Sequence, residues 1–507
     1  VVEQDRPGSG AKRNVTNVYS PGVCVDVSAR VDYQFLMVIF FEQQFHQNNK
    51  NLSETAIGVS LIDLSTGQTR LYEFFSNYRD KNSGLDALLR LIQNYQPREV
   101  VCIGETCPVV DIHSTNHQYS LEQYLNLSGR KTHYRWNDFH SYYKQLSFQK
   151  DILEKYFSNH GMLSVLEFLN LEKHSYALQG YLQMLLFIED HVPSLLENLD
   201  KPEFISEKGK LILAQDCATQ LHIISATNKK NKTSCLLDII NHTSTPMGKR
   251  LLKDRLLVPD TDPDLLNKRY DEIERCHDYI DIFRELLTNI QDMERLHRKA
   301  LLKKLSPTQF FTLHECFKYV LLIASQEYFD TPPKFVTSLQ KYIISYSDIL
   351  ELDKCACWNL DQIDENPFKP GVSENLDEYQ SKVEKHVCFF TDTVFKMSKA
   401  IDPGFTNNSN NNLVKIEYNE REGYHLSVTK KRLEILKKHW PTEIIDIDKV
   451  KFKSAQSVSN KVVKIFSPEI KYHHEERIKY QNLLGEQGRA EFIKRVTDWH
   501  LQYHELF

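Results

Sequence analysis

The sequence has no run of about 18 consecutive apolar residues, which is the length that a membrane-spanning helix requires. Its first thirteen residues, VVEQDRPGSGAKR, contain no apolar signal segment, so nothing in them indicates secretion. We therefore expect an intracellular protein that has no membrane partner, although the compartment is not indicated.

Cysteine is sparse and scattered. Of the ten cysteines only Cys355 and Cys357 lie close together, and no second pair follows at the spacing of zinc ligands. The pair His473-His474 likewise has no third ligand at helical spacing. We expect reduced thiols and no metal site. Positive charge is also not in excess, because 63 Lys and Arg face 68 Asp and Glu for a net charge of −5. Any contact with nucleic acid must therefore be local.

The sequence also lacks a phosphate-binding loop of the form G-x-x-x-x-G-K-[ST]. Gly209-Lys210 is followed by leucine and Gly248-Lys249 by arginine, and neither pair has the upstream glycine. The sequence shows no pattern typical of a Ser-His-Asp triad, a catalytic carboxylate pair or a nucleophilic cysteine. We expect neither a catalytic residue nor a bound cofactor in this chain.

A length of 507 residues exceeds what one hydrophobic core usually supports, so several domains are expected. Residues 19–135 alternate strand-like runs such as MVIFF and EVVCIG with a helix, LDALLRLIQNY, which predicts an α/β domain. Residues 136–404 are almost wholly helical. Residues 405–474 begin at an Asn-rich linker, Thr406–Asn412, and alternate apolar and polar residues as a hairpin does. A polar helix runs from about Pro468 to Phe507.

The most informative stretch is Ser234–Pro263. Ser244 or Thr245 can cap a helix that has Pro246 in its first turn and ends before Pro259, and a second helix should open at Asp262. Glycine is costly inside a helix, so Gly248 suggests close packing against another backbone.

The sequence of this stretch resembles the core domain of the MutS family of DNA mismatch-recognition proteins. In that family an aspartate, a Thr-x-Thr-x-Met-Gly run and a Leu-Leu-x-Pro turn recur in this order. The matching residues are Asp238, Thr243, Thr245, Met247, Gly248, Arg250, Leu251, Leu252, Leu256, Leu257, Pro259 and Asp262.

Further segments resemble other parts of that family. Leu413–Thr429 resembles the family's clamp domain, and Glu374–Glu378 resembles the Glu-Leu-Asp-Glu of its outgoing lever helix, with an insertion. The exit of the clamp is matched by Gln456, Ser457, Asn460, Phe466, Ser467, Pro468 and Glu469. The core is matched by Asp292, Glu294, Arg295 and Pro307. The entry to the connector domain is matched by Val15, Thr16, Ser20, Pro21 and Gly22.

The resemblance implies a multidomain α+β chain. Its parts would be the tail of the mismatch-binding domain (1–18), an α/β connector with a ribonuclease H-like fold (19–135), an all-α core with the outgoing lever helices (136–404), a small inserted β clamp domain (405–474) and the returning lever helix (475–507). The rest of the mismatch-binding domain is expected upstream and the ATPase domain downstream. Phe40-Phe41-Glu42 is expected to be a buried strand of the connector and not the family's mismatch wedge.

The clamp segment carries the charge that the whole chain lacks. Between Tyr424 and His474, eleven Lys and Arg face five Asp and Glu, a local charge of +6. Lysines placed in this way suit phosphate oxygens, which give affinity and register but carry no sequence information. The candidate DNA-binding residues are Lys430, Lys431, Arg432, Lys449, Lys451 and Lys453. A solvated surface that protects strand edges would show the same pattern.

By this resemblance the chain is the DNA-binding scaffold of a mismatch-recognition protein. Its clamp would hold double-stranded DNA and its levers would connect to a DNA-dependent ATPase that uses ATP and Mg²⁺ outside this chain. The partners implied are the duplex and a second MutS-like subunit, in a homodimer or a heterodimer. Two alternatives stay open: an architectural or DNA-packaging protein that retains the clamp and arms without repair, and a MutS-like protein with an appended nuclease.

Overall fold

The computed structural model describes residues 2–4, 13–15, 18–23, 32–46, 49–76, 80–105, 120–136, 138–158, 161–206, 208–211, 213, 217–224, 235–326, 332–360, 365–405, 413–419, 423–440, 450–454 and 462–506. The chain divides into two compact units. Unit 1 comprises residues 1–305, 312–339 and 500–507, and unit 2 comprises residues 306–311 and 340–499. Helices and small sheets occur in both units, so the chain is of mixed α and β structure, as predicted.

Unit 1 contains a six-stranded mixed sheet with the order β7-β6-β3-β4-β5-β8. β3 pairs antiparallel with β4 and parallel with β6, which is the α/β pattern predicted for this region. The strands are β3 (Phe35–His46), β4 (Asn49–Asp63), β5 (Thr69–Ser76), β6 (Glu99–Gly104), β7 (Lys131–Arg135) and β8 (Glu203–Phe204). Two short strands near the N-terminus, β1 (Val2–Gln4) and β2 (Arg13–Val15), pair with each other.

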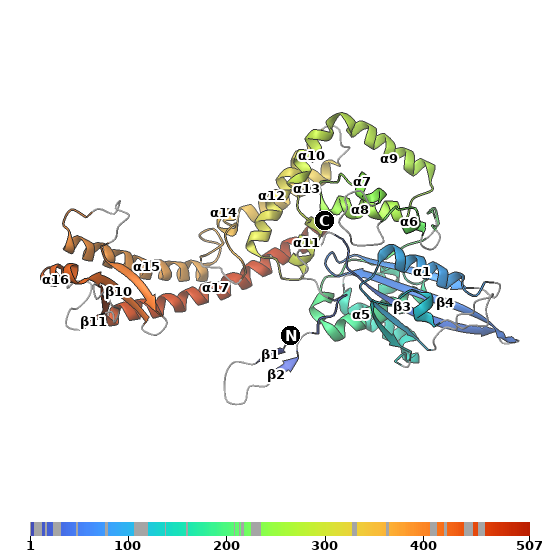
Figure 1. Ribbon diagram of the computed structural model, residues 1–507, viewed down its shortest axis with the longest axis horizontal. Coiled ribbons are helices and arrows are strands. Elements are labelled where there is room, and N and C mark those ends of the chain that lie inside the picture. Colours follow the sequence, from blue (N-terminus) through green and yellow to red (C-terminus); the bar gives the residue numbers. More distant parts are fainter. Residues whose placement is uncertain are drawn as a thin grey trace. The chain divides into compact units, whose positions relative to one another are not determined.

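Helices cover both faces of this sheet (Figure 1). Side chains alternate along β3, so Leu36, Val38 and Phe40 join a core with helix α5 (Ser175–His191), whereas the intervening residues join a second core with helix α1 (Ser83–Tyr95). Phe40 and Phe41 are fully buried in these two cores, which confirms that Phe40-Phe41-Glu42 belongs to a buried strand.

Gly58 of β4 lies directly against the start of α5. A Cβ atom at this position would lie 1.8 Å from the backbone carbonyl oxygen of Tyr176 in the first turn of α5. Because the obstacle is backbone, no side chain can move aside to relieve the contact.

We expect Gly58→Ala to destabilise unit 1 by about 3 kcal/mol, the upper end of the usual cost of overpacking a core. Chemical denaturation of the full chain would measure the change. Gly404→Ala is the control, because Gly404 is exposed and its nearest neighbour would lie at 3.4 Å, an ordinary contact. Equal unfolding midpoints for the two variants would contradict this account.

The predicted division between residues 135 and 136 falls within a shared core. α5 and its neighbours, α3 (Leu146–Tyr156) and α4 (Val165–Phe168), belong to the same apolar cluster as β3. The later strand β8 also pairs with β5. The predicted domain limits stay predictions, and this core favours placing the end of the α/β domain after residue 204.

Two residues of the predicted connector entry bind a buried carboxylate. Glu99 is fully buried and accepts hydrogen bonds from Ser20 Oγ at 2.5 Å and from the Gly22 backbone N–H at 2.9 Å. His133 Nε2 of β7 lies 2.7 Å from the other carboxylate oxygen. Segment 18–23 is thereby fixed to the sheet.

The two helices predicted to start after Ser244 or Thr245 and at Asp262 are confirmed at their starts. α8 (Pro246–Leu257) has Thr245 as its N-cap, and the Thr245 hydroxyl accepts from the Gly248 N–H at 3.0 Å. α9 (Pro263–Cys276) has Asp262 as its N-cap. The expectation for Gly248 was wrong. The nearest atom to a Cβ there is Thr245 Oγ1, not another backbone, so Gly248 leaves room for the cap.

A buried ion-pair network joins two segments of the predicted core. Arg250 of α8 is 2% exposed and donates to both carboxylate oxygens of Asp292, at 2.6 and 2.8 Å, and to Glu294 at 2.5 Å. Asp292 is also the N-cap of α11 (Met293–Leu301). One carboxylate therefore begins a helix and fixes it to α8.

Unit 2 contains two long helices, α15 (Glu374–Ile401) and α17 (Pro468–Gln502), of which only residues 500–502 of α17 belong to unit 1. Among the described residues, no helix combines the length and apolar character needed to cross a bilayer. The remaining helices are α2 (Leu121–Tyr124), α6 (Cys217–Gln220), α7 (Leu236–Ile240), α10 (Ile280–Thr288), α12 (Pro307–Ala324), α13 (Pro333–Ser347), α14 (Leu352–Cys355) and α16 (Lys430–Lys438), with short 3-10 turns η1 (Ser141–Lys144), η2 (Pro193–Leu196), η3 (His277–Tyr279) and η5 (His504–Leu506).

Candidate nucleic-acid interface

The positively charged segment of unit 2 folds as a four-stranded antiparallel sheet, here called the clamp sheet, with the order β11-β12-β10-β9. Its strands are β9 (Lys415–Asn419), β10 (Gly423–Thr429), β11 (Lys451–Ser454) and β12 (Val462–Phe466). The predicted hairpin is confirmed as β9–β10. Helix α16 directly after it was not predicted. The linker Thr406–Asn412 lies outside the described residues.

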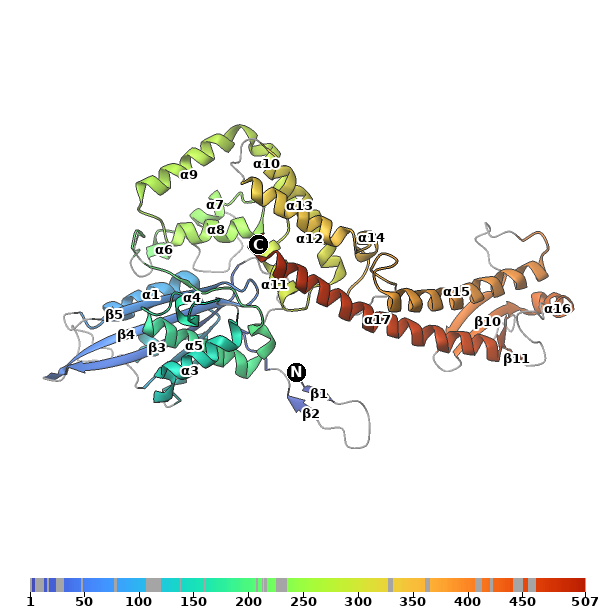
Figure 2. The same cartoon turned by 180° about the vertical axis from the view of Figure 1, so that it is seen from behind.

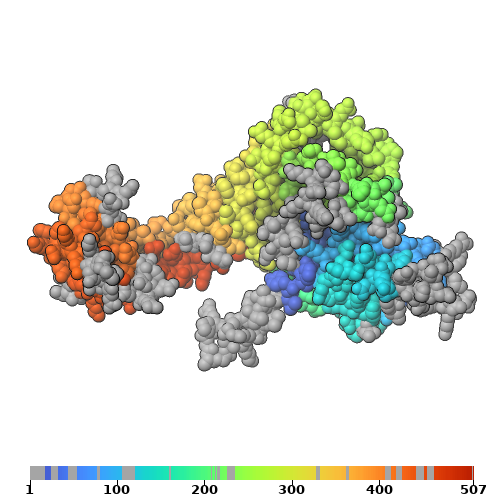
Figure 3. Space-filling model, in the orientation of Figure 1, coloured from blue at the N-terminus to red at the C-terminus, as the bar shows by residue number. Residues whose placement is uncertain are grey.

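One face of the clamp sheet is apolar. The register places Ile416, Leu426, Ile465 and Phe452 side by side across the four strands. These residues pack with Leu433 and Leu436 of α16 and with Phe390 and Met397 of α15 in a single core. In Figures 2 and 3 the strands and the adjoining parts of these helices form one packed body. This core holds the sheet rigid.

The opposite face carries a row of lysines. In the same register Lys453 pairs with Lys464, Lys464 with Ser427, and Ser427 with Lys415, so one row across the sheet contains three lysines. Lys415 and Lys453 are exposed and Lys464 is half-buried. Because paired residues of neighbouring strands have Cβ atoms about 5 Å apart, this row concentrates positive charge on one face.

The structure brings two of the predicted residues to this face. Lys451 and Lys453 are two residues apart on β11 and therefore share a face, as the alternation predicted, and both are exposed. Lys449 lies outside the described residues. Sequence reasoning missed Lys415 and Lys464. Lys415 precedes Ile416 and Lys464 lies between Val463 and Ile465, so alternation along each strand places both lysines opposite these apolar residues, but only the register aligns them with Lys453.

Lys430, Lys431 and Arg432 form the first turn of α16, which begins where β10 ends. Lys430 and Lys431 are exposed. Arg432 is half-buried and its Nη1 donates to the Leu413 carbonyl oxygen at 3.1 Å, so it fixes the start of the hairpin. Positive charge at a helix N-terminus opposes the helix dipole. The two lysines therefore do not serve the stability of α16.

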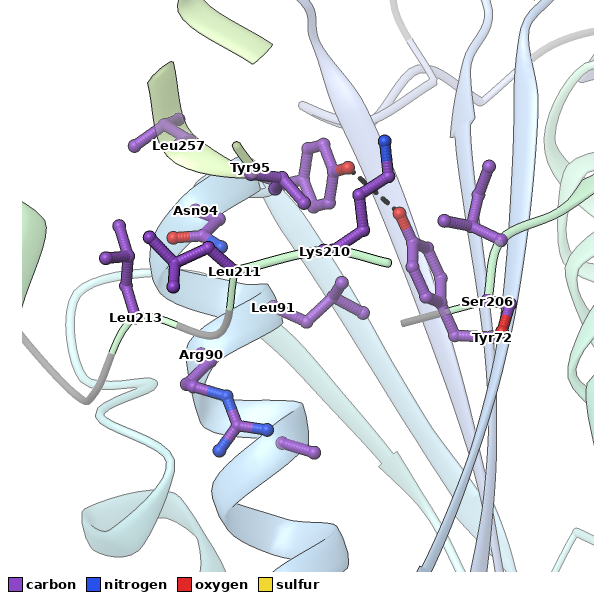
Figure 4. A pocket seen from close by; sticks show the side chains of 13 residues that line it. Tyr72, Arg90, Leu91, Asn94, Tyr95, Ser206, Lys210, Leu211, Leu213 and Leu257 are labelled. Carbon is purple, nitrogen blue, oxygen red and sulfur yellow. Dashed lines mark hydrogen bonds between the residues drawn. The ribbon is translucent and has the colours of Figure 1, made fainter. Parts of the chain in front are cut away.

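A pocket in unit 1 is too small to be the functional site (Figure 4). Its volume is about 50 Å³, far below the range of about 300–1,000 Å³ that is usual for small-molecule sites. It lies between α1, the segment around Lys210 and the end of α8, and Tyr72 and Tyr95 share a hydrogen bond of 2.9 Å between their hydroxyls at its wall. Packing of α1 against this segment accounts for it.

A larger cavity of about 450 Å³ in unit 1 has more acidic than basic residues in its lining. Its Arg70 pairs with Asp254 at 2.7 Å, and its Glu294 is held by Arg250. Burial and the nearby Asp254 raise the pKa of its Tyr33 to about 12, so this phenol stays neutral. Two basic residues face four acidic ones in the lining, a balance that disfavours a phosphate ligand. The clamp sheet is therefore the candidate interface.

Comparison with known proteins decides the family. The family model for MutS domain III matches residues 217–479, which is more than half of the chain. The chain belongs to the MutS family. The mutS homolog L359 of Acanthamoeba polyphaga mimivirus is 30% identical, over 86% of this chain and 41% of its own length. The mitochondrial DNA mismatch repair protein mutS homolog of Sarcophyton glaucum is 24% identical, over 84% of this chain and 44% of its own length.

A bacterial member of the MutS family is similar to this chain to about the same extent. The DNA mismatch repair protein MutS of Caldanaerobacter subterraneus is 23% identical, over 83% of this chain and 44% of its own length. The chain therefore spans less than half the length of these curated relatives. The matched MutS segment contains α8, α11, α15 and the clamp sheet, so it includes both the Arg250 network and the lysine row.

The MutS motifs at the ends of the clamp have local structural roles. Ser467 Oγ accepts from the Glu469 N–H at 3.2 Å, which begins α17 with Pro468 in its first turn. Asp377, from the motif at the start of α15, accepts from the Gly371 N–H at 2.8 Å. Gln456, Ser457 and Asn460 lie outside the described residues.

Proposed function

We propose that this chain is the DNA-binding scaffold of a MutS-family mismatch repair protein, and that the clamp sheet binds the phosphate backbone of double-stranded DNA. The observation that supports this most is the cross-strand row Lys415, Lys464 and Lys453, which presents three cations on the face opposite the apolar core. Phosphate oxygens are the ligands that such a surface suits, and they are spaced regularly along a duplex.

Two further features support phosphate contact. Lys451 adds a fourth lysine to the same face, and Lys430 and Lys431 add charge at the N-terminus of α16, where backbone N–H groups also favour anions. The relatives named above are described as mismatch repair proteins, which act on DNA. Sequence discrimination is not expected here, because phosphate contacts cannot distinguish bases.

The remaining elements of the proposal rest on family membership. Helices α15 and α17, which carry the clamp sheet in unit 2, would couple it to an ATPase that binds ATP and Mg²⁺ outside this chain. A second MutS-like subunit would complete the assembly, and the working protein would be associated with DNA. No described residue is assigned to bind nucleotide.

Equilibrium binding of the purified chain to a 30-base-pair duplex tests the proposal. We expect the logarithm of the affinity to fall linearly with the logarithm of the salt concentration, since bound phosphates release counterions. Matched and mismatched duplexes should bind equally well. Binding that is independent of salt, or confined to the mismatched duplex, would overturn the assignment of the clamp sheet as a phosphate-binding surface.

A further inference from the structure

His386 of α15 and His473 of α17 face each other across the two helices that support the clamp sheet. Their Nδ1 atoms lie 2.8 Å apart. Both residues belong to unit 2. At this distance two ring nitrogens do not both carry a hydrogen, so at least one presents a lone pair to the other and a proton or a cation must lie between them.

The neighbouring rings hold both imidazoles in place. His473 stacks on Phe389, with ring centroids 3.7 Å apart and planes inclined by 8°. His386 is nearly parallel to the ring of Tyr480, at 6.2 Å and 13°. His386 is 7% exposed and His473 is half-buried, so solvent reaches one side of the pair. The two nitrogens are therefore oriented in advance and the site is still accessible.

We propose that His386 and His473 bind a divalent transition metal that prefers ligands at right angles, such as Ni²⁺ or Cu²⁺, with water in the remaining positions. Two nitrogens, each about 2.0–2.1 Å from a metal, are about 2.9 Å apart when they subtend a right angle. Tetragonal sites with nitrogen and oxygen ligands are typical of these two ions.

Among the described residues the site has two protein ligands. No group of three or more His, Cys, Asp or Glu side chains in the described part of the chain is arranged to hold a metal. Binding should therefore be exchangeable and much weaker than at a structural zinc site. Its effect would be to join α15 and α17 close to the clamp sheet and so stabilise their pairing.

Calorimetric titration of the full chain with Ni²⁺ tests this. We expect one site in the wild type whose affinity falls about tenfold or more in His386→Asn and in His473→Asn. His474→Asn, the next residue of α17, is the matched control and should keep the site. X-ray absorption at the nickel edge should show two imidazole ligands in the wild type and in the control.

Thermal unfolding provides the second measurement, which also shows whether each variant is folded. Ni²⁺ should raise the midpoint of the wild type, because a ligand that binds only the folded state stabilises it, and the chelator EDTA should reverse the change. If folded His386→Asn binds Ni²⁺ as the wild type does, or if nickel shows a single imidazole in the wild type, the contact is a hydrogen bond only and the proposal fails.

Discussion

Replacing Arg250 with methionine is expected to destabilise unit 1 by about 3 kcal/mol, the lower end of the usual cost of breaking a buried ion pair by removing one partner, because the remaining carboxylates of Asp292 and Glu294 are partly exposed. The substitution leaves Asp292 and Glu294 without the guanidinium that holds both. Burial opposes the charge of Arg250, but its hydrogen bonds to these two carboxylates outweigh that cost and raise its pKa. The charge is therefore retained in the folded state and its loss is expensive.

Denaturant unfolding of the full chain would measure the effect, and Arg255→Met on the same helix is the matched control because Arg255 is exposed. A double variant, Arg250→Met with Asp292→Leu, should be less destabilised than the sum of the single variants, since the residues are in direct contact. An unchanged midpoint for Arg250→Met would show that the network contributes nothing to stability.

Replacing Lys415, Lys453 and Lys464 together with glutamine should make the plot of log affinity against log salt shallower, by at most about 2.7 if all three lysines contact phosphates. Each lost phosphate contact accounts for about 0.9 of that slope. For the cluster Lys430, Lys431 and Arg432 the expected change is about 1.8, because Arg432 is engaged by the Leu413 carbonyl and only the two lysines are exposed.

The charge-matched control replaces Lys131, Lys173 and Lys334, three exposed lysines outside the clamp sheet. It removes the same charge but should preserve the slope. The loss of affinity in the two clamp variants should be equal for matched and mismatched duplexes. If the variant that replaces Lys415, Lys453 and Lys464 keeps the wild-type slope of log affinity against log salt, those lysines form an ordinary solvated face.

Local rules predicted those features of the fold that depend on a few adjacent residues. The helix starts at Ser244 or Thr245 and at Asp262 were predicted because capping is decided within one turn. The β9–β10 hairpin followed from alternation on either side of a polar turn. Helix α16 was missed because KKRLEILKK was interpreted within a strand-rich segment, although its leucines at positions 433 and 436 have helical spacing.

Features that depend on residues far apart in the sequence could not be predicted. The lysine row needs the pairing of β9, β10, β11 and β12, and two of its three members were not candidates for that reason. His473 was assessed only against neighbours on its own helix, and its partner His386 is on another. The predicted limit at residue 135 was likewise set without knowledge of packing, because only packing shows that α5 covers the sheet.

The strict alternation of the clamp sheet restricts how its length can change. In β12, Val463 and Ile465 are buried in the apolar core while Lys464 lies on the opposite face. Inserting or deleting one residue within this strand would exchange the two faces downstream, exposing an aliphatic side chain and burying a charged one. Length variation in this domain should therefore be tolerated between strands but not within them, and a scan of single-residue deletions would trace the strand limits by loss of folding.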